Sequence, residues 1–192
     1  MSITLSKGQS ISLAKNTGLS NVFMGLGWDA AKPKGFFGRL AGGGDSIDLD
    51  ASVIVMDATG RTLDTVWFRQ LTGMNGAIRH SGDNRTGDGD GDDEVIKIDL
   101  SALPASATSL VFTVNSFTGQ NFNQVENATC RLVDMKGNTE LCSFALGEKG
   151  NHTGVIMAVL SRKSGSWEMK AIGVATNGRT VADLAGEAAR YI

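Results

Sequence analysis

The chain has 192 residues, of which 41% are hydrophobic and 20% are charged, and its formal net charge at pH 7 is −2. This length suits a single domain that spans residues 1–192. The hydrophobic content is enough to build a core, which excludes a wholly disordered chain. A net charge this small gives no electrostatic reason to expect binding to nucleic acid or to an anionic membrane.

The beginning of the chain lacks a basic segment followed by an apolar run, so we expect no signal peptide. No stretch approaches about 18 consecutive apolar residues, so we expect no transmembrane segment. The chain has two cysteines, Cys130 and Cys142. Together these features predict a cytoplasmic protein.

Strand-forming patterns run through most of the chain, as short β-branched and aromatic runs separated by Gly, Asn and Asp clusters. The predicted strands are residues 4–5, 9–13, 21–27, 49–56, 65–68, 77–80, 94–99, 109–116, 128–133, 141–145, 154–162 and 167–175. This spacing predicts an all-β fold of the β-sandwich class. Residues 181–189 instead predict a short C-terminal helix, with Thr180 as its N-cap and Asp183 three residues later.

Two parts of the chain resemble each other. Residues 51–62 and 128–139 each combine a strand, an Asp-x-x-Gly turn and a return strand, with several identities in register. The segments before them also agree, with 11–13 and 21–26 matching 96–98 and 109–114. We interpret this pattern as an internal pseudo-duplication, although unrelated β-hairpins also look alike by chance.

The segment 82–94 is strongly acidic and rich in glycine. Its acidic residues, set against the single arginine Arg85, are Asp83, Asp88, Asp90, Asp92, Asp93 and Glu94. Carboxylates this dense repel one another, and a bound dication would remove the repulsion. Oxygen ligands without a nearby His or Cys pair favour a hard ion such as Ca²⁺. The alternating glycines permit the positive φ angles that a loop needs to wrap an ion.

The acidic segment matches neither of two common calcium motifs. An EF-hand loop would start at Asp88, but its sixth position is Asp93 instead of Gly, and its twelfth, Asp99, lies in a predicted strand. The nonapeptide β-helix repeat is excluded because there is a single copy. A solvated acidic loop without an ion is the alternative interpretation.

A second acidic group lies at the start of a predicted strand. Asp48 and Asp50 are two residues apart, so both project from one face of the sheet while Leu49 and Ala51 face the core. We expect them to meet the acidic loop of a neighbouring strand, with Asp29 joining the same site. The alternatives are two solvent-facing carboxylates and an ordinary turn aspartate. In the pseudo-duplication Asp50 falls opposite Asn127, which places the function in the first half of the chain.

Other candidates carry less information. His80 and His152 lack partners at zinc-like spacing, and neither a nucleophile elbow nor a P-loop is present. The two cysteines are either structural thiols or a redox pair. The aromatic pair Phe36 and Phe37, in the glycine- and lysine-rich loop 30–44, either marks a partner site or packs against the sandwich.

Several motifs together resemble the TerD family of tellurium-resistance and stress proteins. They are LSKG at 5–8, GLGWD at 25–29, IDLDAS at 47–52, HSGDNRTGDGDGDDE at 80–94 and GQNFNQVENA at 119–128. The resemblance covers nearly the whole chain. Three further segments are most similar to the TerZ branch of the family: GFFG at 35–38, DTVWFR at 64–69 and VNSF at 114–117.

The resemblance implies a cytoplasmic calcium-binding β-sandwich that acts in resistance to tellurite and other stresses, without established catalysis. It implies a TerC-type membrane protein and other Ter proteins as partners. The positions that match the family's metal site are Asp29, Asp48, Asp50, Asp83, Asn84, Asp88, Asp90, Asp92, Asp93 and Glu94. Ser46 stands where some relatives have Asp, and residues 115–118 lack the acidic stretch of many relatives, so the resemblance does not extend to a second ion site there.

We therefore expect a calcium-responsive binding module that is not an enzyme. The alternative is a metal-dependent hydrolase that uses the same acidic cluster, which would need a nucleophile or base beside an open metal position. A redox module built on the two cysteines is a third possibility.

Overall fold

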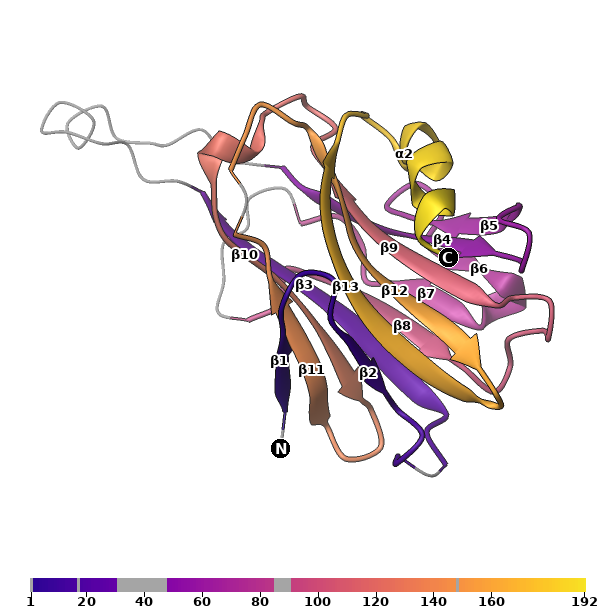
Figure 1. The fold of residues 1–192 in the computed structure, drawn as a ribbon. Helices are drawn as coiled ribbons and strands as arrows, with labels where there is room; N and C mark the ends of the chain where they lie inside the picture. The colour runs from indigo at the N-terminus through magenta and orange to yellow at the C-terminus, as the bar shows by residue number, and fades with distance from the viewer. Residues whose placement is uncertain (1, 17, 31–47, 85–90, 148) are drawn as a thin grey trace, which may run out of the picture.

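The computed structural model describes residues 2–16, 18–30, 48–84, 91–147 and 149–192. They form two β-sheets that pack face to face, with a short helix at the C-terminus (Figure 1). Sheet A contains, in spatial order, β1 (Ile3–Leu5), β11 (Thr139–Ala145), β10 (Val125–Asp134), β3 (Asn21–Ala30), β8 (Glu94–Asp99), β7 (Ile78–His80) and β6 (Thr72–Gly73). Sheet B contains β2 (Ser10–Ser12), β13 (Ser166–Thr176), β12 (Gly154–Lys163), β9 (Ser109–Asn115), β4 (Asp50–Met56) and β5 (Thr62–Val66).

The predicted all-β sandwich with one C-terminal helix is confirmed. The helix is α2 (Val181–Ala188), and the described residues also form three 3-10 turns: η1 (Met74–Gly76), η2 (Phe122–Gln124) and η3 (Ala189–Tyr191). The predicted N-cap is also present, because the Asp183 carboxylate accepts hydrogen bonds from the backbone N–H groups of Arg179 and Thr180, at 3.0 and 2.9 Å.

The strand order supports the pseudo-duplication. In sheet A the run β11-β10-β3-β8 is antiparallel throughout, and in sheet B the run β5-β4-β9-β12 is arranged in the same way. The four strands β3, β4, β5 and β8 thus have β9, β10, β11 and β12 as counterparts. One predicted correspondence is wrong: residues 11–13 do not match β8, because residues 11 and 12 belong to β2 at the edge of sheet B. A short apolar alternation does not specify which strand will lie beside it.

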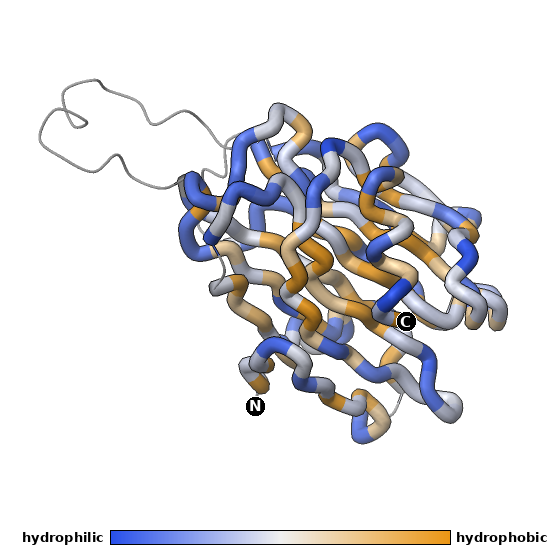
Figure 2. Tube along the Cα trace, turned by 45° about the horizontal axis from the view of Figure 1, so that its top comes forward, coloured by the Kyte–Doolittle hydropathy of each residue, from blue (hydrophilic) through white to orange (hydrophobic). Residues whose placement is uncertain are grey.

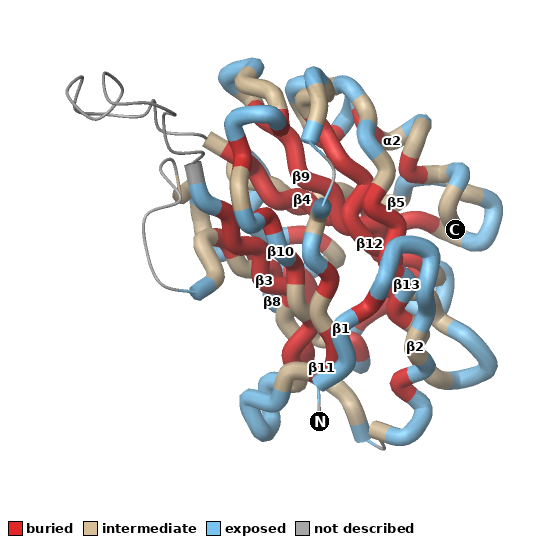
Figure 3. The backbone as a smooth tube through the Cα atoms, turned by 60° about the vertical axis from the view of Figure 1, so that its left-hand side comes forward, coloured by how far each residue is buried: buried red, intermediate tan, exposed pale blue. Residues whose placement is uncertain are grey.

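The core follows from the alternation along the strands. In β3 the side chains of Val22, Met24, Leu26 and Trp28 are buried between the sheets, whereas Asn21 and Asp29 are exposed. Buried segments occupy the middle of both sheets and exposed ones lie in the connecting loops (Figure 3). The hydropathy of the chain follows the same division (Figure 2). Burial of this apolar surface is the main stabilising contribution to the fold.

A second apolar layer lies on the outer face of sheet B. Val181, Leu184 and Ala188 of α2 pack on outward-facing residues such as Ile54 and Val111. Helix α2 therefore covers part of this face, as Figure 1 shows.

The strands at one edge of each sheet differ most from the prediction. The strand predicted at 65–68 is found earlier in the chain, as β5 at 62–66. It ends there because Trp67 and Gln70 form a tight turn with paired backbone hydrogen bonds of 3.1 and 2.9 Å. The aromatic residues there belong to the turn despite their strand propensity. Strand β6 has two residues, which is too short to show a period of two in the sequence.

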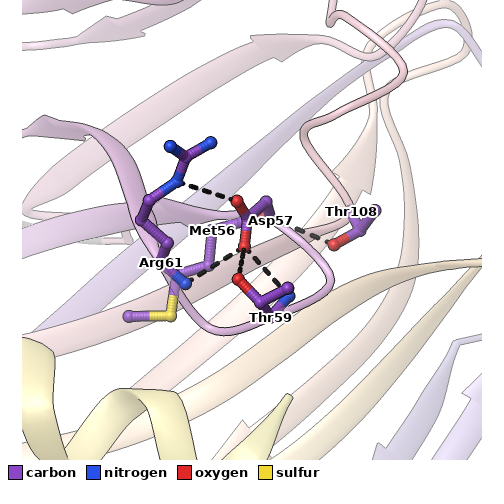
Figure 4. Close-up of polar contacts among 5 residues, drawn as sticks. All are labelled: Met56, Asp57, Thr59, Arg61 and Thr108. Atoms are coloured by element: carbon purple, nitrogen blue, oxygen red, sulfur yellow. Dashed lines mark hydrogen bonds and ion pairs between the residues drawn. The ribbon is translucent and has the colours of Figure 1, made fainter.

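The Asp-x-x-Gly turn after β4 explains one of the repeated motifs (Figure 4). The Asp57 carboxylate accepts hydrogen bonds from the Thr59 side chain, the Thr59 and Arg61 backbone N–H groups and the Arg61 guanidinium. These bonds, led by that of the Thr59 hydroxyl, lower the pKa of Asp57 to about 2. Gly60 has a φ of +83°, which this turn requires. The motif is thus a structural turn at the end of a hairpin.

Candidate metal site

Three carboxylates from two sheets meet at one end of the sandwich. Asp50 is the first residue of β4 in sheet B and Asp48 lies two residues before it, while Asp83 follows β7 of sheet A. One oxygen of each carboxylate lies within 4.8 Å of those of the other two. We call these three residues the carboxylate triad. Such a spacing lets one cation contact all three groups.

Asp50 is the member of the triad with the most demanding environment. Its side chain is 1% exposed, and Oδ2 has no hydrogen-bond partner within the described ranges. Burial, followed by the negative charges of Glu94, Asp48 and Asp83, raises the pKa of Asp50 to about 8. A buried carboxylate with an unsatisfied oxygen and acidic neighbours needs a proton or a metal ion.

A further oxygen lies beside Asp50 on the same face of sheet B. Asn115 of β9 is paired directly opposite Asp50 and is 1% exposed. Its amide nitrogen donates to the Arg179 carbonyl at 2.9 Å, whereas no donor in the described part of the chain contacts Oδ1. The site therefore combines carboxylate oxygens with a neutral amide oxygen, a donor set that suits a hard cation.

Glu94 joins the two sheets beside the triad. It is fully buried at the start of β8 and reaches across the interior, where Oε2 accepts a hydrogen bond of 2.7 Å from the Ala51 backbone N–H of β4. Oε1 accepts from the Asn84 N–H at 3.1 Å. Glu94 therefore uses both oxygens to hold backbone groups that flank Asp50 and Asp83.

His80 completes this connection between the sheets. The Gly82 N–H donates to His80 Nδ1 at 3.0 Å, so the ring proton lies on Nε2. Nε2 is 3.0 Å from the Ala51 carbonyl and 3.4 Å from Glu94 Oε2. His80 and Glu94 thus satisfy the carbonyl and the N–H of Ala51, as a neighbouring strand would. The sequence predicted no such role for His80, although its position two residues after buried Ile78 places it on the inner face.

Asp93 and Asn84 link the acidic loop to β3. The Asp93 carboxylate accepts from the Trp28 backbone N–H at 2.9 Å and from the Asn84 side-chain amide at 3.1 Å. Since Asn84 directly follows Asp83, these bonds fix the end of the segment that carries the third carboxylate of the triad.

Asp92 points to the outer face of sheet A. Its carboxylate accepts two hydrogen bonds from Arg131 of β10, at 2.8 and 2.9 Å, in a bidentate ion pair. Both carboxylate oxygens are thus engaged by the guanidinium.

Asp29 lies in a separate polar depression of about 240 Å³ on the outer side of sheet A. Its carboxylate accepts a hydrogen bond of 2.7 Å from the Asn127 side chain, and Asp93 also lines the depression. Asn127 has a φ of +52° where the β10–β3 register shifts, which explains how its side chain reaches Asp29.

The predicted ligands are therefore separated by the fold. Asp48, Asp50 and Asp83 come together, whereas Asp29 lies in the second depression. The other four described candidates bind groups of the protein. Asp92 binds Arg131, and Asp93 binds the Trp28 N–H and the Asn84 side chain. Glu94 binds the N–H groups of Ala51 and Asn84. Asp88 and Asp90 lie outside the described residues, as do Phe36 and Phe37. The acidic cluster formed by the triad can hold a metal ion.

The two cysteines are buried thiols on neighbouring strands. Cys130 of β10 is paired with Phe144, and Cys142 of β11 is paired with Leu132, so the thiols are diagonal neighbours on the inner face. Burial raises the pKa of Cys130 to about 12 and that of Cys142 to about 11, with smaller contributions from Cys142 and Glu140 respectively. This environment supports structural thiols over a redox pair, because the thiolate is the reactive form.

We expect the native protein to resist alkylation at both thiols. A maleimide reagent at pH 7.5 should label neither Cys130 nor Cys142 over the minutes in which it labels both in denaturant, which mass spectrometry would measure. Fast labelling of the native protein would show that the thiols are accessible and would reopen the redox interpretation.

The other histidine has a structural environment. The His152 ring stacks on Phe122, with 4.8 Å between the ring centroids and 20° between the ring planes. Among the described residues, the group of side chains that could share one ion does not include His152.

Comparison with known proteins identifies the family. A family model described as the TerD domain matches residues 1–187. The chain belongs to the TerD family. It is 54% identical over 183 residues to the tellurium resistance protein TerZ of Serratia marcescens, covering 95% of this chain and 94% of that protein. It is 42% identical over 182 residues to general stress protein 16U of Bacillus subtilis, covering 90% of each. The predicted resemblance is confirmed.

A solved structure shares the fold of this TerD-family chain. The crystal structure of a homologue of a telluride resistance protein from Streptomyces coelicolor superimposes with a TM-score of 0.69. At 23% identity it covers 88% of this chain and 96% of that one. The likeness confirms the TerD-like sandwich. The helices among the described residues lack the length and hydropathy that a membrane span requires.

Proposed function

We propose that this TerD-family protein is a calcium-binding module of a tellurite-resistance and stress-response system. The observation that carries the proposal is the triad, in which the buried Asp50 carboxylate faces two other carboxylates and has an oxygen that receives no hydrogen bond from the described residues. Oxygen donors alone favour a hard cation, and Ca²⁺ accepts irregular sets of oxygen ligands, whereas Mg²⁺ demands a strict octahedron. The names of the relatives from Serratia and Bacillus support the stress-response role.

We propose a binding role instead of hydrolysis. A metal-dependent hydrolase needs a base that can activate water beside the ion. His80 is the titratable ring nearest to this network, but Gly82 donates to one of its nitrogens and the other lies against the Ala51 carbonyl. Glu94 is likewise engaged by backbone N–H groups. As partners we propose other Ter proteins, including a TerC-type membrane protein, which the family resemblance implies.

Calcium should stabilise the folded protein. Because the ion binds the folded state, a calcium concentration about 100-fold above Kd should add about 2.7 kcal/mol of stability, which corresponds to an increase in Tm of roughly 5–10 °C over the value in chelator. Thermal unfolding with calcium and with EDTA, together with calorimetric titration, measures the shift and the stoichiometry.

Variants separate the triad from the other acidic residues. Asp83→Asn should abolish most of the calcium-dependent Tm shift with little change in the EDTA value, because Asp83 is exposed. Asp134→Asn is a matched control, since Asp134 lies in the hairpin turn at the opposite end of β10 and accepts from the Lys136 N–H. Equal Tm values with calcium and EDTA for the parent protein would refute the proposal. A nuclease and phosphatase assay with calcium, magnesium and manganese tests the hydrolase alternative.

A further inference from the structure

Residues 91–93, which we call the strap, lie across the outer face of β3. The Asp93 N–H donates to the Leu26 carbonyl at 2.7 Å and so continues the pairing of β8 with β3. The strap lies so close to β3 that positions 25 and 27 of the strand have no room for a side chain. A Cβ atom on Gly25 would lie 2.3 Å from the Asp92 carboxylate, and one on Gly27 would lie 2.7 Å from the Gly91 carbonyl oxygen.

Arg131 holds this strap from the neighbouring strand. It is paired directly opposite Gly25 in the β10–β3 ladder, so the missing side chain of Gly25 leaves the space in which the Asp92 carboxylate meets the guanidinium. The guanidinium also lies 5.8 Å from the centre of the Phe23 ring and 3.6 Å from Glu140. The Asp92 side chain is 11% exposed, so this ion pair is more shielded from solvent than a typical surface pair.

A continuous set of contacts leads from this ion pair to the triad. Asp92 is followed by Asp93, whose carboxylate binds the Trp28 N–H and the Asn84 side chain. Asn84 in turn donates its backbone N–H to Glu94 and directly follows Asp83. Any movement of the strap away from β3 would therefore loosen the segment that positions Asp83 against Asp48 and Asp50.

We infer that Arg131 is a positioning residue for the metal site, although it contacts none of the three triad carboxylates. By binding both oxygens of Asp92, it fastens the strap to β3, and it directs Asp92 away from the ion. This inference rests on the proposed calcium site. Groups that orient a metal site from outside the ligand set commonly contribute about 10- to 100-fold in metal affinity.

Removal of the Arg131 guanidinium should lower the affinity for calcium. Arg131→Met and Asp92→Asn should each weaken calcium binding about tenfold, and the double variant should be no weaker than either single one. If Asp92 were instead a calcium ligand, Arg131 would compete with the ion, and Arg131→Met would bind calcium more tightly. Calorimetric calcium titration of the parent and the three variants distinguishes these outcomes. Unchanged or tighter binding by Arg131→Met overturns the inference.

Two further measurements separate the inference from general loss of structure and from failure of the proposed function. Arg79→Met is the matched control, because Arg79 is an exposed arginine of β7 in the same sheet, and its calcium affinity should equal that of the parent. Hydrogen exchange in EDTA should show faster exchange at the N–H groups of Asp93 and Asn84 in Arg131→Met, with β12 and β13 unchanged. If the parent binds no calcium, the proposed function fails, while this exchange result still decides whether Arg131 fastens the strap. Parent-like exchange there would refute the fastening.

Discussion

Asp50→Asn should stabilise the calcium-free protein at alkaline pH and abolish its response to calcium. The pKa of Asp50 is raised to about 8 by burial and by its acidic neighbours, whereas an unfolded aspartate titrates near 3.8. The folded state therefore holds a proton that the unfolded state releases between these values, so the free energy of unfolding falls as pH rises from about 4 through about 8. Asparagine carries no charge at any pH, so the variant does not lose stability in this way as the pH rises.

The effect should be large because each pKa unit between the folded and unfolded states corresponds to about 1.4 kcal/mol. In EDTA at pH 8.5 the Tm of Asp50→Asn should exceed that of the parent by about 10 °C or more, and the difference should shrink to about 5 °C or less at pH 5. Calcium should narrow this difference, because the ion stabilises only the parent. Thermal unfolding from pH 5 to 9 in EDTA and in calcium measures all four values. A parent Tm that is independent of pH in EDTA would contradict the environment assigned to Asp50.

Glu94→Gln should destabilise the fold although the two side chains have the same shape. Both carboxylate oxygens of Glu94 accept backbone N–H groups, from Ala51 at 2.7 Å and from Asn84 at 3.1 Å. Glutamine has one acceptor oxygen, so its amide nitrogen must face one of these donors. The substitution therefore leaves one buried N–H without an acceptor and removes a charge-assisted hydrogen bond. Together these changes should lower the free energy of unfolding by about 2–4 kcal/mol, or the Tm by roughly 5–15 °C.

This measurement is best made at pH 6 in EDTA. Asp50 keeps its proton at that pH, so relief of the repulsion between Asp50 and Glu94 does not offset the loss. Glu126→Gln serves as the control, since Glu126 pairs only weakly with Lys149, at 3.4 Å, and its side chain is 37% exposed. The Glu126→Gln substitution should change the free energy of unfolding by less than about 0.5 kcal/mol. A Glu94→Gln protein as stable as this control would show that the contact between the sheets contributes little.

Much of the fold could be predicted from local patterns. Alternation of apolar and polar residues located β3 and β8, because their inner faces are buried continuously. It failed where tertiary packing overrides local propensity. Trp67 and Phe68 have strand-forming side chains, but the fold places them in a turn, where their rings meet edge to face at a centroid distance of 5.0 Å.

The acidic loop also shows which properties of the site depend on composition and which depend on tertiary contacts. Its composition indicated a need for a counter-charge, but Asp92, Asp93 and Glu94 are consecutive and all carry carboxylates. Nothing in their order distinguishes a group that can approach a cation from one that binds Arg131 or the Ala51 N–H. Those partners are 39 and 43 positions away in the chain, so only the register of the strands determines which acid meets which donor.

The sequence by itself thus determined the β-sandwich, the family and the excess of carboxylates at one place, because these depend on side-chain alternation, motif spacing and charge. Only the tertiary structure decided which carboxylates form the triad and which fasten the loop. The reason is that a hydrogen bond or an ion pair depends on the position and direction of both groups. Pairing of β10 with β3 brings Arg131 to Asp92, and the packing of sheet A on sheet B brings Glu94 to Ala51 and Asp83 to Asp50.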